Sequence, residues 1–290
     1  MDSTMNDPLA TAQWLHENLS DENISIVDMR GYVKKQPAGP GLETATYSGA
    51  RDEYEESHIP GATYIDWTQD IIDPDDPIPA QLAPPELFKD AMESRGISDD
   101  STVVIYDHEG GQFATRLWWA LTYYEHENAC VLDGGWERWQ QEGRPVTPEV
   151  AEPARGSFTS SPRPEWLANV EEVAANLDAE DVQIVDARGL AQYDGSVRRK
   201  GRAGHIPSAI HFDKSQLFQD TGGYKPLEEI ERLLNSASIN KEKKVITYCN
   251  GGVAATPILF SLHRLGSTGL ANYDGSWNEW GSREDLEVEV

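Results

Sequence analysis

The sequence predicts an α/β fold built from two tandem domains, each a mainly parallel sheet with helices on both faces. Three observations predict it: a repeat of about half the chain, short β-branched runs that alternate with helical patterns, and a proline-rich segment between the two copies. The length of 290 residues suits two domains of ordinary size.

Four motifs occur twice and in the same order along the chain. Residues 26–30 (IVDMR) recur as 184–188 (IVDAR), 58–62 (HIPGA) as 205–209 (HIPSA), 103–107 (VVIYD) as 245–249 (VITYC), and 132–139 (LDGGWERW) as 273–280 (YDGSWNEW). Four ordered matches indicate a duplication, so each element of one copy predicts a counterpart in the other.

The second copy shows the alternation of strands and helices most clearly. Residues 182–185 and 245–248 are brief β-branched runs with the length of buried parallel strands. The following patterns complete the copy: helical spacing of Leu227, Ile230, Leu233 and Leu234, a helix over 254–265 that stops at Gly266, a strand over 270–273 and a short helix over 275–280. Alternating elements of this kind form a parallel sheet covered by helices.

The segment between the two copies is rich in proline. Residues 144–164 contain five prolines together with Ser, Thr and Gly, which predicts an extended, semi-rigid linker. We therefore expect an N-terminal domain of residues 1–150 and a C-terminal domain of residues 151–290, with the boundary in this linker.

The charge balance excludes some partners. Fifty acidic residues against 24 basic ones give a formal net charge of −26, which repels nucleic acid and anionic membrane surfaces. Only nine of the basic residues are Lys. Strong salt favours a folded, acidic, lysine-poor protein, because the screening length at molar salt is only ~3 Å. We expect a halophilic cytoplasm as its setting.

The remaining bulk features agree with a cytoplasmic protein that has no membrane partner. Residues 1–8 have neither a basic start nor an apolar stretch, and no window approaches the ~18 apolar residues that a membrane span needs. The two cysteines, Cys130 and Cys249, lie far apart in sequence, so we expect no disulfide framework.

Cys249 is the candidate nucleophile. It ends a predicted parallel strand and precedes a glycine-rich turn into a helix, a position at the usual ligand crevice of an open α/β sheet. Backbone N–H groups of such a turn and the start of the helix favour the thiolate, and they can also hold an anionic donor or a persulfide. Cys130 lies inside an apolar run without glycines, which predicts a packing role.

With these motifs the chain resembles the tandem rhodanese-domain sulfurtransferases, a family that includes thiosulfate and mercaptopyruvate sulfurtransferases. The resemblance is carried by VDAR at 185–188, GHIP at 204–207, the Cys249 loop and DGSW at 274–277. It implies two rhodanese-like domains, of which the first is catalytically inactive because Asp107 occupies the cysteine position. It also implies a six-residue active loop made of Cys249, Asn250, Gly251, Gly252, Val253 and Ala254.

The chemistry implied by the resemblance is ping-pong sulfur transfer. The Cys249 thiolate attacks the outer sulfur of the donor, becomes a persulfide and releases sulfite or pyruvate. Cyanide or a thiol then removes the sulfur. No metal and no organic cofactor are expected, because the sulfur itself carries the reaction.

An anionic donor needs cationic partners. Arg188 matches the substrate-binding arginine of the family, whereas the second arginine of many relatives, four residues on, is Gln192 here. The basic run Arg198, Arg199, Lys200 and Arg202 precedes the GHIP motif, and we expect it to reach the cleft and compensate. His58 and His205 occur in both copies, which favours a shared turn-forming role over catalysis.

We expect thiosulfate as the donor, and 3-mercaptopyruvate is the alternative because residues 250–253 carry no charge. A carrier that passes its persulfide to a partner protein and a non-catalytic rhodanese binding module are further alternatives. A cysteine phosphatase is disfavoured, because its loop would end in an Arg that forks two phosphate oxygens, and here it closes with Ala254 and Ala255.

Overall fold

The computed structural model describes residues 7–199 and 201–290. The sequence interpretation of residues 1–6 and any role of Lys200 in the basic run lie outside the described residues.

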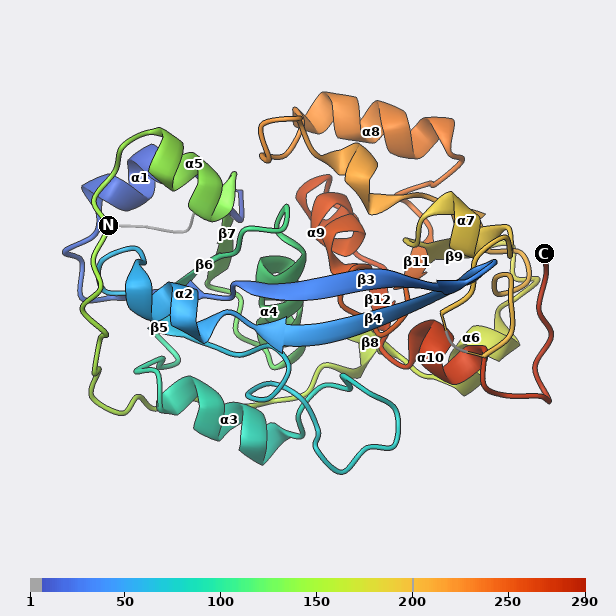
Figure 1. Ribbon diagram of the computed structural model, residues 1–290, viewed down its shortest axis with the longest axis horizontal. Coiled ribbons are helices and arrows are strands. Elements are labelled where there is room, and N and C mark those ends of the chain that lie inside the picture. Colours follow the sequence, from blue (N-terminus) through green and yellow to red (C-terminus); the bar gives the residue numbers. More distant parts are fainter. Residues whose placement is uncertain (1–6, 200) are drawn as a thin grey trace.

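Two five-stranded sheets, one in each half of the chain, have the same strand order (Figure 1). The first sheet has the order β1 (Leu9–Ala10), β7 (Ala129–Leu132), β6 (Thr102–Tyr106), β2 (Ile24–Asp28) and β5 (Thr63–Tyr64). The second has the order β8 (Leu167–Ala168), β12 (Leu270–Tyr273), β11 (Lys244–Tyr248), β9 (Val182–Asp186) and β10 (Ile210–His211). All neighbouring strands in both sheets pair in parallel, so the predicted duplicated α/β fold is confirmed.

Helices cover both sheets. In the first half they are α1 (Ala12–Glu17), α2 (Arg51–Glu56), α3 (Pro85–Glu93), α4 (Gln112–Tyr123) and α5 (Gly135–Gln141). In the second half they are α6 (Val170–Ala175), α7 (Leu190–Tyr193), α8 (Leu227–Ser236), α9 (Thr256–Arg264) and α10 (Ser276–Trp280), with 3-10 turns η1 (Pro164–Trp166) and η2 (Lys214–Leu217). The helices predicted around 227–234, 254–265 and 275–280 are those labelled α8, α9 and α10.

The two faces of each strand belong to different cores, because successive side chains of a strand point to opposite faces. Ile26 of β2 packs in a cluster with α1, α2 and α5, whereas its neighbour Val27 belongs to a larger cluster with α3 and α4. In the second sheet Ile184 and Val185 divide in the same way. Val27 and Val185 lie in the same large cluster, so one continuous core joins the two halves.

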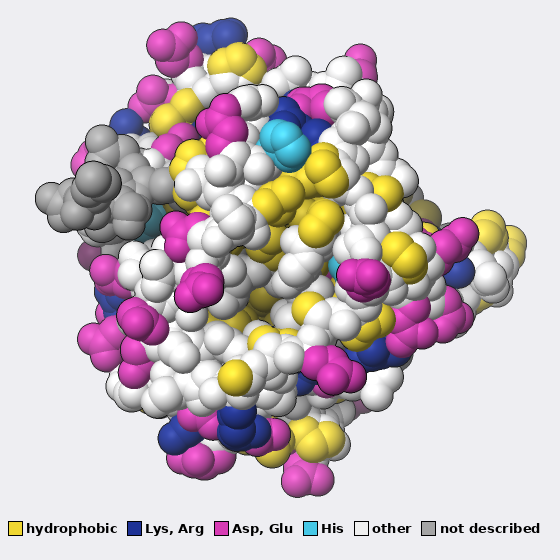
Figure 2. All heavy atoms as spheres, turned by 90° about the vertical axis from the view of Figure 1, so that its left-hand side faces the viewer, with side chains coloured by type: hydrophobic (Ala, Val, Ile, Leu, Met, Phe, Trp, Pro, Cys, Tyr) yellow, Lys and Arg dark blue, Asp and Glu magenta, His cyan; other side chains and the backbone are white. Residues whose placement is uncertain are grey.

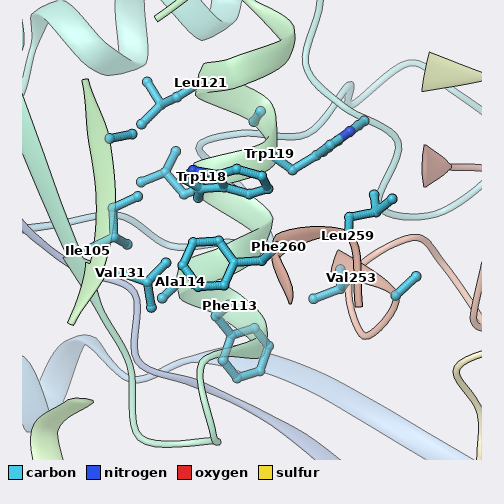
Figure 3. Close-up of a cluster of buried hydrophobic side chains, with 14 of the residues drawn as sticks. Ile105, Phe113, Ala114, Trp118, Trp119, Leu121, Val131, Val253, Leu259 and Phe260 are labelled. Carbon is cyan, nitrogen blue, oxygen red and sulfur yellow. The ribbon is translucent and has the colours of Figure 1, made fainter. Parts of the chain in front are cut away.

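Helices α4 and α9 form the centre of that shared core. The rings of Trp118 and Phe260 meet edge to face with centroids 4.9 Å apart, a favourable aromatic geometry (Figure 3). Near the start of both helices the hydroxyls of Thr115 and Thr256 are hydrogen-bonded at 2.8 Å. The two helices that follow the duplicated loops therefore pack directly against each other.

A long hairpin, absent from the predicted elements, leaves the first half and reaches the second (Figure 1). It consists of β3 (Gly31–Gly39) and β4 (Leu42–Gly49), paired antiparallel. At its tip Glu43 N donates to Arg198 O and Arg198 N donates to Gly41 O, both at 3.0 Å. We call this hairpin the arm.

The segment between the halves is extended, as predicted for residues 144–164. It is held by the bridge between His58 and Thr147, by a hydrogen bond from Gly156 N to Glu93 O (2.8 Å) and by the buried ring of Phe158. Within residues 7–199 and 201–290, no helix is long and apolar enough to cross a membrane.

Candidate active site

Cys249 lies directly after β11, where the sheet of the second half ends and the loop to α9 begins. Only 3% of the residue is exposed, yet it lines a cavity of about 470 Å³ whose walls come from both halves of the chain. Its neighbours Asn250, Gly251, Val253 and Ala254 line the same cavity. The thiol is therefore shielded from the outer surface and open to an internal cleft.

The loop after Cys249 is held from the side of α10. Ser276 Oγ accepts hydrogen bonds from Cys249 N (3.1 Å) and Gly252 N (3.0 Å), and it donates to Tyr273 O (2.7 Å). The carbonyls of Cys249 and Asn250 accept from the N–H groups of Trp277 and Asn278. Among the described residues, the N–H groups of Gly251, Val253, Ala254 and Ala255 have no protein acceptor.

The corresponding loop of the first half indicates what this loop architecture binds. Asp107 takes the place of Cys249, and four backbone N–H groups converge on its carboxylate. Oδ1 accepts from Glu109 and Gly111 at 2.9 and 2.8 Å, and Oδ2 accepts from Phe113 and Ala114 at 2.8 and 2.9 Å. The first loop thus holds an anion at its centre, as expected for a nest of N–H groups at the start of a helix.

Arg188 lines the cavity, but its guanidinium is already engaged. Nε and Nη2 donate to the Asp186 carboxylate at 3.0 and 2.6 Å, and Nη2 also donates to Gly204 O at 2.8 Å. The guanidinium carbon lies 4.4 Å from the ring centroid of Trp277. Arg30 of the first half has the same three kinds of contact, with Asp28, a backbone carbonyl and a Trp ring.

The basic run divides in the structure. Arg199 lines the cavity and pairs with Glu43 of the arm at 2.6 Å. Arg198 is exposed and donates to Gly201 O (3.3 Å), and Arg202 donates to Leu286 O (2.7 Å) and two further carbonyls of the C-terminal segment. The expectation that Arg198 and Arg202 reach the cleft is therefore wrong, since neither residue lines the cavity. The guanidinium of Arg202 binds backbone carbonyls near the C-terminus instead of an anion in the cleft.

Gln192, where the resemblance predicts a second arginine, links the loop to the arm. Its Oε1 accepts from Asn250 Nδ2 and its Nε2 donates to Glu43 Oε1, both at 3.0 Å. The tip of the arm therefore contacts the residue next to Cys249 through one side chain.

Two lysines of the cavity wall were missed by the sequence interpretation. Lys35 of the arm and Lys214 of η2 line the cavity, and neither forms an ion pair with a described residue. Burial lowers the pKa of Lys214, against the opposing attraction of acidic neighbours that include Asp213. What distinguishes these two lysines is their place in the cavity wall, where each keeps an ammonium without an ion-pair partner among the described residues.

The cavity wall is not uniformly basic. Asp73, Asp76, Glu109 and Asp213 also line it, along with the apolar surface of Trp67. Three of these carboxylates accept hydrogen bonds from nearby backbone N–H groups, those of Asp75, Ile78 and Ser215. Among the described residues of the cavity wall, the groups without a protein partner include the ammonium groups of the two lysines, the side-chain amide of Asn278 and several N–H groups of the loop.

The residues expected to have structural roles lie outside this cavity. The imidazoles of His58 and His205 bond to Tyr54 O and Tyr193 O and stack on the rings of the same tyrosines. Cys130 is buried in the first half, and burial raises the pKa of its thiol to about 12.

Comparisons with known proteins agree with this geometry. The model of the Rhodanese-like domain family matches residues 11–142 and 169–283. The 3-mercaptopyruvate sulfurtransferase of Escherichia coli K12 is 34% identical over 96% of both chains, and the thiosulfate sulfurtransferase of Gallus gallus is 32% identical over 97% of this chain and 96% of its own. The crystal structure of SseA from Escherichia coli, a 3-mercaptopyruvate sulfotransferase, matches with a TM-score of 0.82 at 29% identity, covering 93% of this chain and 99% of its own.

Proposed function

The chain belongs to the rhodanese family as a tandem sulfurtransferase, and we propose that it moves a sulfane sulfur from thiosulfate to cyanide or a thiol through a persulfide on Cys249. One observation carries the proposal. Cys249 opens into the cavity at a loop in which the N–H groups of Gly251, Val253, Ala254 and Ala255 have no acceptor among the described residues. In the corresponding first loop, four N–H groups are occupied by the Asp107 carboxylate.

The reaction has two balanced steps. The Cys249 thiolate attacks the outer sulfur of thiosulfate, a new S–S bond forms, and the old S–S bond breaks with its electron pair on the departing sulfite. Cyanide then attacks the outer sulfur of the persulfide, so that thiocyanate leaves and the thiolate returns. The persulfide anion lies where the loop N–H groups converge, and their hydrogen bonds stabilise its charge.

The proposed donor site combines the loop with cations of the wall. The backbone of Asn250, Gly251, Gly252, Val253 and Ala254 surrounds the transferred sulfur. Lys35 and Lys214 bind the charged end of the donor. Arg188, held in its ion pair with Asp186, supports the site from the cavity wall. Arg199 contributes by holding the arm through Glu43, and Arg198 and Arg202 take no part.

The two halves have different tasks in this proposal. The C-terminal domain, residues 151–290, carries the nucleophile. The N-terminal domain, residues 1–150, has lost its nucleophile to Asp107 and supplies part of the cleft wall, including Lys35 and Trp67.

The first test replaces each thiol in turn. Cys249→Ser abolishes thiocyanate formation from thiosulfate and cyanide, because serine is not ionised at neutral pH and cannot form a persulfide. Cys130→Ser retains most of the activity, since burial keeps that thiol protonated. Thiocyanate assays on both variants and the parent decide the matter, and an active Cys249→Ser enzyme would refute the proposal.

3-Mercaptopyruvate is a second candidate donor, favoured by two observations. Residues 250–253 carry no charge, and a cavity of about 470 Å³ has room for an organic acid as well as for a small inorganic anion. With this donor the attacked C–S bond breaks toward pyruvate, whose enolate takes up a proton.

Parallel rates on one preparation separate the donors. We expect a higher kcat/KM with thiosulfate, because two unpaired lysines suit a dianion. A clearly higher kcat/KM with 3-mercaptopyruvate would instead identify that compound as the donor. Transfer only to a protein thiol, with neither cyanide nor small thiols accepted, would instead identify a persulfide carrier.

The setting is also part of the proposal. The acidic, lysine-poor composition favours a salt-rich cytoplasm. On the face drawn in Figure 2, acidic side chains are spread widely and outnumber the basic ones, which supports this part of the proposal.

A further inference from the structure

A buried ion pair joins the two halves beside the Cys249 loop. Arg116 of α4 pairs with Asp274, which follows β12, and their side chains are only 2% and 5% exposed. Arg116 Nη1 bonds to Asp274 Oδ1, and Nη2 donates to Oδ2 at 3.1 Å. The guanidinium also lies over the ring of Trp119, with its carbon 4.6 Å from the centroid.

The pair contacts the Cys249 loop at Gly252. The carbonyl of Gly252 accepts from Asn272 Nδ2 at 2.9 Å and lies 3.5 Å from Arg116 Nη1. Gly252 has a φ of +73°, and a Cβ at this position would collide with Asp274 Oδ1, so only glycine fits.

Holding this carbonyl also directs the next N–H group. In a planar trans peptide the C=O and the following N–H point in opposite directions. With the Gly252 carbonyl turned toward Arg116 and Asn272, the N–H of Val253 is directed away from them. That N–H is one of the loop groups without a protein acceptor among the described residues.

The same pair also holds the wall of the cleft next to the loop, at residues 80–82. Arg116 Nη2 donates to Ala80 O at 2.9 Å, and the Asp274 carboxylate accepts from Leu82 N at 2.8 Å. Gln81 Nε2 donates to Asp274 O at 3.2 Å. Ala80 has a φ of +69° and lines the cavity, so this strained turn is fixed by the pair.

We propose that Arg116, in the half of the chain that lacks the nucleophile, is a positioning residue for sulfur transfer at Cys249. With Asp274 it fixes the loop at Gly252 and the wall at Ala80 in one arrangement. The inference rests on the proposed function, and it assigns to the first half a direct influence on the reactivity of the second.

The duplication supplies a matched control. Asp133 is the counterpart of Asp274, and it pairs with Arg138 of its own half while accepting from Tyr224 N of the other at 2.8 Å. Neither Asp133 nor Arg138 lines the cavity of Cys249. Arg138→Met therefore removes the counterpart ion pair, whose side chains are more exposed (25% and 16%), without disturbing the Cys249 loop.

The main experiment measures the rate at which iodoacetamide alkylates Cys249, as a function of pH. Cys130 does not compete, because its pKa is raised to about 12. In Arg116→Met we expect slower alkylation at neutral pH, with the midpoint of the profile moved to higher pH. We also expect kcat to fall roughly tenfold to a hundredfold, as for other small displacements of a reacting group. Arg116→Lys recovers part of the loss, and Arg138→Met matches the parent.

A second variant separates positioning from folding. Arg116→Met leaves the Asp274 carboxylate buried without its cation, which destabilises the fold. Arg116→Met combined with Asp274→Asn buries no charge, so its melting temperature recovers. Its kcat and alkylation profile stay impaired, because no cation holds the carbonyls of Gly252 and Ala80. Full recovery of both readouts in the double variant would reduce the pair to a structural contact and overturn the inference.

The alkylation profile also keeps this inference separable from the proposed function. If the parent enzyme transferred no sulfur from either donor, the proposed function would fail. A shift in the pH profile of Cys249 alkylation in Arg116→Met would still support the positioning role. An unchanged profile would contradict that role.

Discussion

Arg188 and Arg30 occupy equivalent positions in the two copies and have equivalent contacts. Each guanidinium pairs with the Asp two residues earlier, donates to a backbone carbonyl and lies over a Trp ring. What differs is the surroundings, since only Arg188 lines the cavity of Cys249. Any effect that both arginines share is structural, and only an effect peculiar to Arg188 reports on the donor.

The lysine variants of these two arginines separate those effects. Arg188→Lys and Arg30→Lys each lose the planar fork that matches a carboxylate, which costs about 1.5–3 kcal/mol of unfolding free energy. We expect similar losses in urea unfolding, but a several-fold rise in the KM for thiosulfate only in Arg188→Lys. An unchanged KM in Arg188→Lys would remove Arg188 from the donor site.

The three described arginines of the basic run have different partners, which the local sequence does not predict. Arg198, Arg199 and Arg202 are alike in sequence, and their separate fates depend on partners that are distant along the chain. Glu43, which binds Arg199, lies more than 150 positions away, and the carbonyls that bind Arg202 belong to the last residues of the chain. No local pattern reports such contacts.

The strands and helices that could be predicted are those whose signal is local. Residues 184–185 and 245–247, in the middle of β9 and β11, are β-branched because both faces of the sheet are buried there. The arm was missed because its residues are mostly exposed and polar, so neither hydrophobic run nor clear alternation marks it. The arm contacts Arg198 and Gln192 of the other half. An alternation of side chains along a strand predicts a strand, but it does not predict which distant residues the strand will contact.

The arm provides its own control for the role of Lys35. Val33 pairs with Tyr47 across the hairpin, and Val33, Lys35 and Tyr47 line the cavity. Lys34 points to the other face, where its ammonium lies over the ring of Tyr32.

We therefore expect different results from two identical changes of charge. Lys35→Met raises the KM for thiosulfate about fivefold, equivalent to roughly 1 kcal/mol, with little change in kcat. Lys34→Met leaves both constants near those of the parent. Steady-state kinetics at one ionic strength test this, and equal effects of the two variants would mean that Lys35 acts only through the overall charge.

At the scale of the whole molecule, the structure gives the half that carries Asp107 at the position of Cys249 a role in building the cleft. Its sheet and the sheet of the second half share one core through α4 and α9, and its loop at Ala80, its arm and Trp67 form walls of the cleft. Neither half could form this cavity alone. The duplicated motifs predicted the two sheets, whereas the cleft between them depends on insertions that differ between the copies.

The net charge of −26 leads to the last prediction, because it acts on the whole fold. Like charges repel more strongly in the compact state than in the unfolded chain, and salt weakens that repulsion as the screening length falls from about 10 Å at 0.1 M to about 3 Å at 1 M. We expect the melting temperature to rise steadily as KCl increases from 0.1 M into the molar range at constant pH. As a control, Glu22, Glu180 and Glu284 are exposed and form no ion pair with a described residue. Replacing all three by Lys should raise the melting temperature in low salt and flatten its dependence on KCl. A melting temperature that falls as KCl rises would refute adaptation to strong salt and leave the fold and the Cys249 chemistry untouched.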